Sequence, residues 1–437
     1  MSEIQECVLY RGDMEHGEIL LEMAKLMDAL SDDRKDPDSL KPVFFRCVGE
    51  LVEMAGAYGF SGNLWHDYLT LLLVNHENAF STACEIRGAV GGSIQELALH
   101  DFEIFRNLYA FDLTAFDRLF HTSCCRIICS YQAAENTGKM FNRRVRDRIC
   151  DMSRTLAQTE NSTEFMEDMV RFYKDFGVGK LGLHKAFRIE HDEKGNVVIA
   201  PIKRIAHVAL DDLVGYEIPK QKLIENTEAF VRGRKANNCL LFGDAGTGKS
   251  SSIKGILNRY YDEGLRIIEV YKHQFKDLNQ VISQVKDRNY KFIIYMDDLS
   301  FEEFEIEYKY LKAVIEGGLE RKPDNILIYA TSNRRHLVRE RSGDKLELND
   351  EDDLHSSDTV QEKLSLVYRF GVRIYFGAPG RKEFQNIVKT LAERNEIQMP
   401  EERLLLEAGQ WELSHGGLTG RTAQQFIDHL LGKESGS

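Results

Sequence analysis

The sequence Cys239-Leu240-Leu241-Phe242-Gly243-Asp244-Ala245-Gly246-Thr247-Gly248-Lys249-Ser250 lies near the middle of the chain. Its last eight residues match the phosphate-binding spacing G-x-x-x-x-G-K-[ST] at every fixed position. Apolar residues precede the glycines, and Ile253, Ile256 and Leu257 follow at helical spacing. The pattern predicts a short buried strand, a phosphate-binding loop and a helix.

The predicted loop carries the groups that bind nucleotide phosphates. Its glycines allow a tight turn that brings backbone N–H groups against phosphate oxygens, and the helix adds the positive end of its dipole. Lys249 is expected to reach the β- and γ-phosphates, and Ser250 to ligate Mg²⁺. An ordinary glycine turn is the alternative. We predict ATP and Mg²⁺ as cofactors, and the nucleotide-binding residues are Gly243, Asp244, Ala245, Gly246, Thr247, Gly248, Lys249, Ser250 and Ser251.

Two polar strand ends follow downstream. The apolar segment 292–296 ends in Asp297-Asp298, which is typical of the Walker B strand that brings a carboxylate beside the bound Mg²⁺. We assign Asp297 to the metal and Asp298 as the candidate base. The segment 326–330 leads to Asn333, whose amide is expected to hold the attacking water. The alternative for Asp297-Asp298 is a buried strand that ends in two acidic turn residues, and the alternative for Asn333 is a capping turn.

The order of segments predicts the fold class. Strands at 239–242, 266–270, 292–296, 326–330 and 372–376 alternate with helices, which predicts an α/β fold with a five-stranded parallel sheet and helices on both faces. We expect a helical N-terminal domain over 1–175 and a hairpin or linker over 176–210. The ATPase core is expected over 211–376 and a helical lid over 377–437. The segment 211–216 precedes the phosphate loop, where an adenine pocket is expected.

The order of parts resembles the AAA+ ATPases. Three stretches resemble, more closely, the bacterial AAA+ family catalogued as domain of unknown function 815: Met296 to Glu303, Leu311 to Glu320 and Tyr329 to Leu337. Gly215, Asn237-Asn238 and Gly420 to Ala423 match the same family. The resemblance implies that Asn333 is the sensor-1 residue and that Arg421 senses the γ-phosphate from the lid. It also implies a homo-oligomer in which Arg369 reaches the neighbouring subunit's nucleotide.

Two departures from the AAA+ pattern affect these assignments. Most AAA+ enzymes carry Asp-Glu at the Walker B position, whereas this chain has Asp297-Asp298, which favours slow hydrolysis. Tyr368 stands before Arg369, where an acidic or small residue is more usual. The arginine finger therefore has rivals, namely Arg373, Arg334 and Arg335.

Composition excludes several classes of protein. The 437 residues carry a formal net charge of −13, which argues against a protein that coats nucleic acid or an anionic membrane. No apolar run is long enough to cross a bilayer, and the start is polar and acidic rather than a signal peptide. The 8 cysteines are scattered, as expected for reduced thiols. We predict a cytoplasmic protein without membrane association, and an unidentified protein client in preference to nucleic acid.

Two clusters in the N-terminal part have competing interpretations. A predicted helix over 116–131 contains His121, Cys124, Cys125 and Cys129, which could hold a soft metal but are better explained as buried packing residues. A basic run from Lys139 to Arg148 could contact nucleic-acid phosphates, but a solvated helix face is favoured.

The sequence favours an ATPase that couples hydrolysis of Mg·ATP to conformational remodelling of an unidentified partner. The alternative is a nucleotide-gated loader or binding switch with little intrinsic hydrolysis. A small-molecule kinase is a third possibility and is disfavoured, because no acceptor site is evident.

Overall fold

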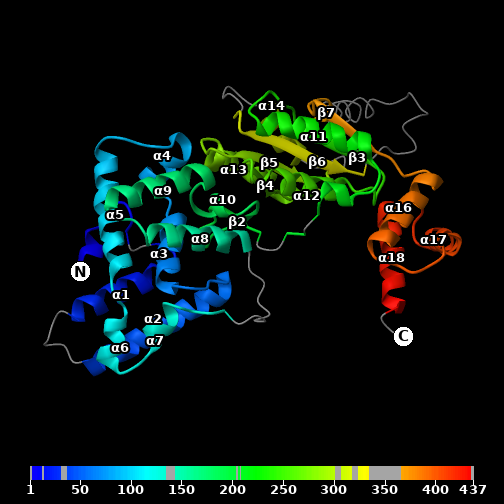
Figure 1. Cartoon of the computed structure of the whole chain (residues 1–437). Helices are drawn as coiled ribbons and strands as arrows, with labels where there is room; N and C mark the ends of the chain where they lie inside the picture. The colour runs from blue at the N-terminus through cyan, green and yellow to red at the C-terminus, as the bar shows by residue number, and fades with distance from the viewer. Residues whose placement is uncertain are drawn as a thin grey trace. The chain divides into compact units, whose positions relative to one another are not determined.

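The chain forms two compact units, residues 1–184 and 185–437 (Figure 1). The structure is a computed structural model, and it describes residues 2–11, 14–30, 37–133, 143–202, 205–206, 208–300, 307–316, 323–333 and 366–434. The two units are considered separately below.

The first unit is helical. Its core is rich in aromatic side chains, including the fully buried Trp65, Tyr68 and Phe102. The amphipathic pattern of the first long helix explains its packing, because Ile19, Leu20, Met23, Leu26 and Met27 recur at helical spacing and are all buried. The helices are η1 (Ser2–Glu6), α1 (Gly17–Leu30), α2 (Pro37–Tyr58), α3 (Leu64–Asn75), α4 (Ala79–Arg87), α5 (Ser93–Ala110), α6 (Thr114–Phe120), α7 (Cys124–Ile128), α8 (Arg143–Leu156), α9 (Ser162–Phe176) and α10 (Gly179–Leu183).

The prediction of one helix over 116–131 is wrong, because the chain turns between α6 and α7. His121 has a left-handed backbone with φ of 54°, which ends α6. The carboxylate of Asp117 then accepts the backbone N–H groups of Cys125 and Arg126 and so satisfies the start of α7. His121 therefore does not share a helical face with Cys125 and Cys129. Within the described ranges, no group of three or more His, Cys, Asp or Glu side chains is arranged to hold a metal ion.

The second unit is built on a seven-stranded sheet with the order β2-β1-β4-β5-β6-β3-β7. Its strands are β1 (Ala186–His191), β2 (Val197–Pro201), β3 (Cys239–Gly243), β4 (Leu265–Glu269), β5 (Lys291–Met296), β6 (Ile326–Ser332) and β7 (Val372–Phe376). The five strands β3 to β7 run parallel, which confirms the predicted α/β fold. The predicted hairpin is present as β1 and β2. Because β1 pairs in parallel with β4, the hairpin joins the sheet and raises its strand number from the predicted five to seven.

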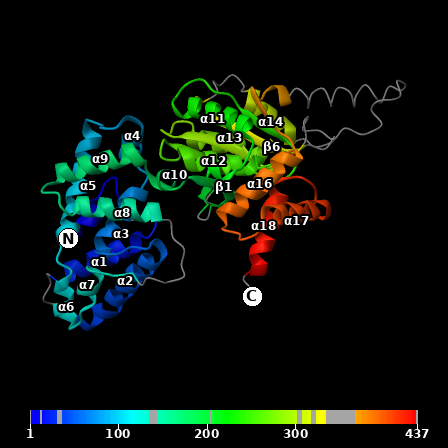
Figure 2. The same cartoon turned by 45° about the vertical axis from the view of Figure 1, so that its right-hand side comes forward.

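Helices cover both faces of this sheet (Figures 1 and 2). Both alternating sets of strand side chains are buried, as β5 illustrates with five consecutive buried residues. The helices of this α/β layer are η2 (Leu210–Asp212), α11 (Glu217–Val231), α12 (Lys249–Tyr260), η3 (Lys272–Asp277), α13 (Leu278–Val285) and α14 (Glu307–Glu316). Helices α11 and α12 share one apolar cluster with β3, β5 and β6.

Three further helices complete the second unit: α16 (Arg381–Arg394), α17 (Glu401–Ser414) and α18 (Gly420–Glu434). They have a small apolar core of their own, centred on Phe384, Val388 and Ile427. Val214, from the loop 211–216, packs against this core. The C-terminal helices therefore lie against the loop that precedes α11.

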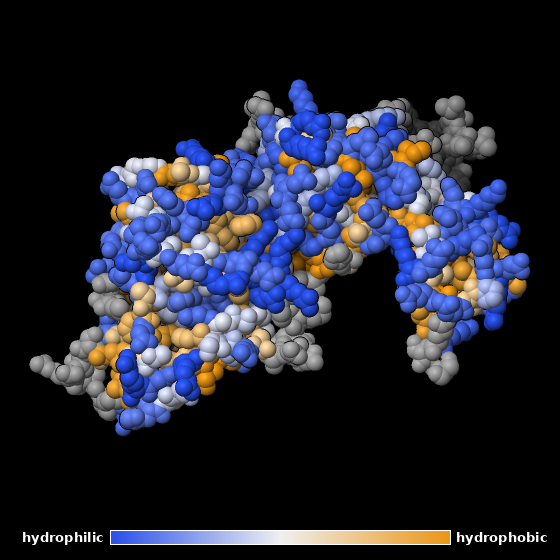
Figure 3. Space-filling view, viewed as in Figure 1, coloured by the Kyte–Doolittle hydropathy of each residue, from blue (hydrophilic) through white to orange (hydrophobic). Residues whose placement is uncertain are grey.

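The surface shown in Figure 3 is largely hydrophilic, with small apolar areas between charged residues. None of the described helices combines the length and the apolar character needed to span a membrane.

Candidate functional site

The predicted phosphate loop connects the end of β3 to the start of α12. Gly243, Gly246 and Gly248 all have positive φ, at 134°, 75° and 87°. A side chain at Gly243 would meet the carbonyl oxygen of Phe376 at 2.1 Å, so only glycine fits between β3 and β7. The N–H of Asp244 donates to the same carbonyl at 3.0 Å. The sheet therefore fixes the first turn of the loop.

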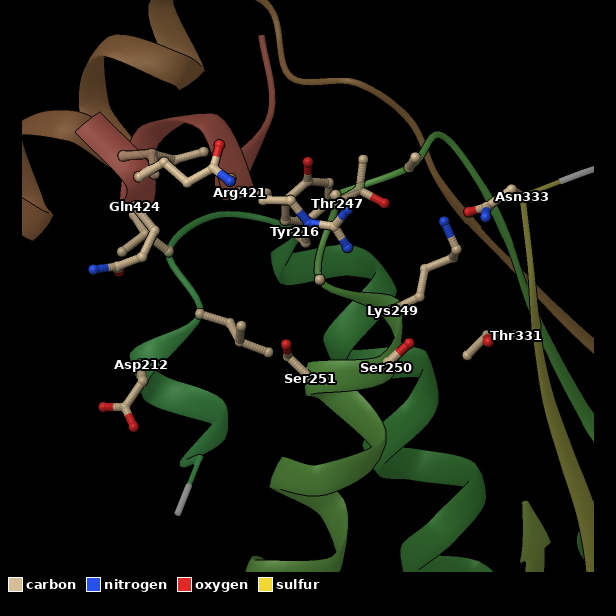
Figure 4. A pocket seen from close by; sticks show the side chains of 18 of the residues that line it. Asp212, Tyr216, Thr247, Lys249, Ser250, Ser251, Thr331, Asn333, Arg421 and Gln424 are labelled. Carbon is tan, nitrogen blue, oxygen red and sulfur yellow. The ribbon is translucent and has the colours of Figure 1, made fainter. Parts of the chain in front are cut away.

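Lys249 lies inside this loop. Its ammonium group donates to the carbonyl oxygens of Gly243 at 3.0 Å and Asp244 at 2.6 Å. Only 6% of the residue is exposed. Burial lowers the pKa of Lys249, although the carboxylates of Asp244, Asp298 and Asp297 oppose this shift. The ammonium group is thus largely withdrawn from solvent and held by two loop carbonyls, and Figure 4 shows the Lys249 side chain among the residues that line the cavity.

The two acidic residues follow β5 directly, beside the start of α12. Oδ1 of Asp297 accepts hydrogen bonds from Ser250 Oγ at 2.7 Å, from Tyr295 OH at 2.7 Å and from Thr331 Oγ1 at 2.5 Å. Burial by itself raises the pKa of Asp297, but these three hydroxyl donors outweigh it and lower the pKa. Burial and the nearby Asp297 charge raise the pKa of Tyr295, so its phenol stays a donor.

Asp298 has a different environment from Asp297. Its backbone is left-handed, with φ of 49°, which is uncommon for a residue other than glycine. Its N–H donates to Thr331 Oγ1 at 2.9 Å, and its carboxylate accepts the side-chain amide of Asn333 at 2.8 Å. The end of β6 therefore orients both carboxylates that follow β5.

Arg421 reaches the site from the start of α18 (Figure 4). The backbone N–H of Arg421 donates to the carbonyl of Gly246 at 3.1 Å, so α18 is attached directly to the phosphate loop. Its positive charge also contributes to the lowered pKa of Lys249, after the larger effect of burial. Gln424 and Gln425 line the same cavity one turn further along α18.

The loop 211–216 forms another wall of the site, separate from the one that carries Asp297 and Asp298. Arg394 of α16 donates from Nη1 to the carbonyl of Asp212 and from Nη2 to that of Asp211, both at 2.8 Å. Lys220 donates to the next carbonyl, that of Leu213, at 2.7 Å. Two cations thus fix three consecutive carbonyl groups and hold this loop between α11 and α16.

These elements enclose a cavity of about 590 Å³. That volume lies within the range of small-molecule and cofactor sites. The lining residues come from the loop 211–216, the phosphate loop, the ends of β5 and β6, and the C-terminal helices: Asp212, Leu213, Val214, Tyr216, Ala245, Gly246, Thr247, Gly248, Lys249, Ser250, Ser251, Asp297, Asp298, Thr331, Asn333, Ile387, Leu391, Gly420, Arg421, Gln424 and Gln425. The lining combines apolar side chains with an ammonium group, a guanidinium and carboxylates, and this combination fits a nucleotide in chemistry and size.

The residues also fit Mg²⁺ beside the phosphates. Ser250 and Asp297 supply a hydroxyl and a carboxylate oxygen that already lie 2.7 Å apart, and oxygen ligands are those that Mg²⁺ prefers. When bound, the ion would neutralise phosphate charge and polarise the transferred phosphoryl group. Thr331 and Tyr295 would support the carboxylate from behind.

The predicted arginine finger is not part of this cavity. Arg369 is exposed, just before β7, and does not line the cavity. Its rival Arg373 is on β7, and its guanidinium lies 5.4 Å from the ring of Tyr368. Arg334 and Arg335 lie outside the described residues. The finger assignment stays a prediction.

Sequence reasoning missed, among others, three residues that support this site. Tyr295 has the same side-chain direction as Asp297, since strand residues two apart share a face, and this spacing was a usable signal. Thr331 touches Asp297 only because β5 and β6 pair with Met296 opposite Ala330, a register that the sequence alone does not give. Arg394 binds a loop more than 180 residues away in sequence, so no local pattern indicated its role.

Several solved structures resemble part of the chain. A single-site mutant of RuvB from Thermotoga maritima is 17% identical with a TM-score of 0.36, over 51% of this chain and 65% of that one. The Thermotoga maritima RuvB Holliday junction branch migration motor is 14% identical with a TM-score of 0.32, over 51% of this chain and 72% of that one. The FIGL-1 AAA domain in complex with ADP is 17% identical with a TM-score of 0.36, over 53% of this chain and 76% of that one.

The chain thus spans 65% of the length of the first of these RuvB structures. No curated protein sequence matches it. The sequence model of one family, described as "Protein of unknown function (DUF815)", matches residues 182–434, which include the whole sheet, the cavity and the C-terminal helices. This match confirms the resemblance inferred from the motifs around Asp297, Asn333 and Arg421. The chain belongs to the DUF815 family, and its second unit has an α/β core with a mostly parallel sheet and C-terminal helices.

Proposed function

We propose that this protein is an ATPase that binds Mg·ATP in the cavity around Lys249 and uses its hydrolysis to change the conformation of a partner. The observation that carries the proposal is the convergence of Lys249, Ser250, Asp297, Asp298 and Arg421 on one cavity. Two carboxylates, a hydroxyl, a buried ammonium and a guanidinium from a separate helical layer match the requirements of phosphoryl transfer.

Each residue has a distinct role in this proposal. Lys249 and the loop amides hold the phosphates, and Ser250 and Asp297 hold Mg²⁺. Asp298 takes a proton from the attacking water, which Asn333 orients. Arg421 links the γ-phosphate to α18, so that loss of this phosphate alters how the C-terminal helices sit on the phosphate loop.

The partner is proposed to be a protein, since a net charge of −13 opposes a nucleic acid. Assembly of several copies would allow Arg369, which lies outside the cavity of its own chain, to act on a neighbouring one.

A nucleotide-gated switch is the second candidate, and a specific contact supports it. The amide of Asn333 already engages the carboxylate of Asp298 at 2.8 Å. Asp298 is also one methylene shorter than the glutamate usual in AAA+ enzymes. If this contact persists with nucleotide bound, Asp298 is held away from water and hydrolysis is slow.

Phosphate release by the purified protein tests both candidates. The ATPase predicts Mg²⁺-dependent release that Lys249→Ala abolishes. Lys254→Ala, an exposed lysine one turn along α12, serves as the matched control and should keep wild-type activity. Asp298→Asn should retain nucleotide binding but lose at least about 10²-fold in rate, the usual contribution of a general base.

Tight Mg·ATP binding without phosphate release would instead support the switch. If Lys249→Ala binds nucleotide as tightly as the wild type, or if the wild type binds none at any concentration tested, both candidates are removed, because both require this loop.

A further inference from the structure

One oxygen of Asp297 receives an unusual number of hydrogen bonds. Ser250, Tyr295 and Thr331 all donate a hydroxyl to Oδ1, at 2.7, 2.7 and 2.5 Å. A carboxylate oxygen has two lone pairs, so three donors exceed its regular capacity by one. One of the three hydroxyls can therefore leave without leaving Oδ1 unsatisfied.

Ser250 is the donor with a second assignment. Under the proposed function its hydroxyl ligates Mg²⁺, and it then turns away from Asp297. Tyr295 and Thr331 have no comparable assignment, because neither side chain belongs to the phosphate loop. After Ser250 turns, two donors remain for the two lone pairs of Oδ1, and the other carboxylate oxygen, Oδ2, which accepts none of these three bonds, is left for the metal.

We infer that Tyr295 and Thr331 are positioning residues that hold Asp297 for the metal and thereby set the affinity of the site for Mg²⁺. This inference rests on the proposed function. Partners that hold a metal-binding group in place typically change metal affinity or activity by about 10- to 100-fold when they are removed.

Thr331 has a wider role than Tyr295. Its Oγ1 also accepts the N–H of Asp298 at 2.9 Å, and its carbonyl accepts the N–H of Leu299 at 2.7 Å. These bonds hold the left-handed turn at Asp298. Loss of the Thr331 hydroxyl should therefore disturb both carboxylates, whereas loss of the Tyr295 hydroxyl should disturb only the metal side.

A purely structural role for the Tyr295 hydroxyl is the competing explanation, and the sheet supplies its control. Tyr329 lies directly opposite Tyr295 in the β5–β6 register and is also buried. Its hydroxyl bonds to Asn226 and Thr227 of α11, each at 2.9 Å, and does not reach the acidic residues. Tyr329→Phe therefore removes a buried phenol hydroxyl from the same sheet without touching Asp297.

The experiment measures binding of fluorescently labelled ADP, first in EDTA and then across a series of MgCl₂ concentrations. Tyr295→Phe should raise, by about 10- to 100-fold, the MgCl₂ concentration at which Mg²⁺ strengthens ADP binding to half its maximal extent. Its affinity for the nucleotide in EDTA should stay within about twofold of wild type, since the phosphate loop is intact. Tyr329→Phe should match wild type in both measurements.

Thr331 provides a second pair of variants, in case Tyr295→Phe does not fold. Thr331→Val keeps the shape but loses the hydroxyl and should reproduce the raised Mg²⁺ requirement. Thr331→Ser keeps the hydroxyl and should restore most of the wild-type Mg²⁺ dependence.

An unchanged Mg²⁺ requirement in folded Tyr295→Phe, or in folded Thr331→Val, would overturn the inference while leaving the proposed function standing. An equal shift in Tyr329→Phe would also overturn it, because the effect would then belong to sheet packing. Failure of the wild-type protein to bind nucleotide at all would remove the proposed function and this inference together.

Discussion

Replacement of Arg394 by alanine tests whether the C-terminal helices hold the nucleotide cavity in shape. In the wild type, the guanidinium bridges the carbonyls of Asp211 and Asp212 with two hydrogen bonds of 2.8 Å. Arg394→Ala removes both bonds and frees α16 from the loop 211–216. That loop forms one wall of the cavity, so its disorder should weaken nucleotide binding.

The size of the effect follows from the geometry and the exposure of Arg394. A hydrogen bond from a charged donor contributes about 1.5–3 kcal/mol in a buried setting. Arg394 is exposed, so each bond is expected nearer the value of surface charge pairs, about 0.5–1 kcal/mol. Two bonds give about 1–2 kcal/mol, which corresponds to roughly 5- to 30-fold weaker binding.

Titration with fluorescent ADP measures this loss directly. Arg394→Lys should fall between wild type and Arg394→Ala, because one ammonium group replaces a planar fork that bridges two carbonyls. Arg403→Ala is the matched control, since this exposed arginine of α17 pairs with Glu407 of its own helix. If Arg394→Ala binds ADP within twofold of wild type and remains folded, the bridge does not support the nucleotide site.

Three further perturbations test other parts of the molecule. Gly243→Ala should lower the free energy of unfolding in urea by at least about 2 kcal/mol, since its Cβ would lie 2.1 Å from a β7 carbonyl oxygen. Gly233→Ala, at a position with positive φ and open space, should lower it by about 1 kcal/mol, and equal losses would contradict the close approach. Burial raises the pKa of Asp67 from 3.8 to about 6, so its contribution to stability is complete below pH 4 and is lost as the pH rises through 6. Between pH 4 and pH 7, Asp67→Asn should therefore gain about 2.4 kcal/mol in free energy of unfolding relative to wild type, and a constant difference would refute the shift. Arg369→Ala mixed with Lys249→Ala should regain ATPase activity if Arg369 acts across subunits, and no recovery in a proven co-assembly would exclude that role.

The fold was predictable because its signals are local. Each parallel strand of the core is a short, mostly apolar run, and four of the five, β3, β5, β6 and β7, are followed directly by a glycine, acidic or amide residue. This pattern predicted the parallel sheet and brought Lys249, Asp297 and Asn333 to one edge. The break at His121 was not predicted, because apolar residues continue at helical spacing on both sides of the turn.

The site was only partly predictable, because its supporting contacts depend on register and tertiary packing. Thr331 lies beside Asp297 because of the pairing of β5 with β6. Arg394 meets the loop 211–216 because Val214 of this loop packs against the apolar core of the C-terminal helices. The hairpin itself was expected. Its pairing with β4 could not be predicted, because the sequence does not show which core strand lies at the edge of the sheet. Such contacts join segments far apart in sequence, where no spacing rule applies.

The β1–β2 hairpin also bears on how the sheet is protected from edge-to-edge strand aggregation. Strand β4 would otherwise end the sheet, and four of its five residues are buried, so its free edge would be a template for another strand. The hairpin replaces that edge with β2, a five-residue strand that ends in Pro201 and has the carbonyl of Val197 occupied by Gln284. Short edges and proline discourage further strand addition. A chain shortened to begin after Pro201 would retain every residue of the nucleotide cavity and still be expected to aggregate through β4.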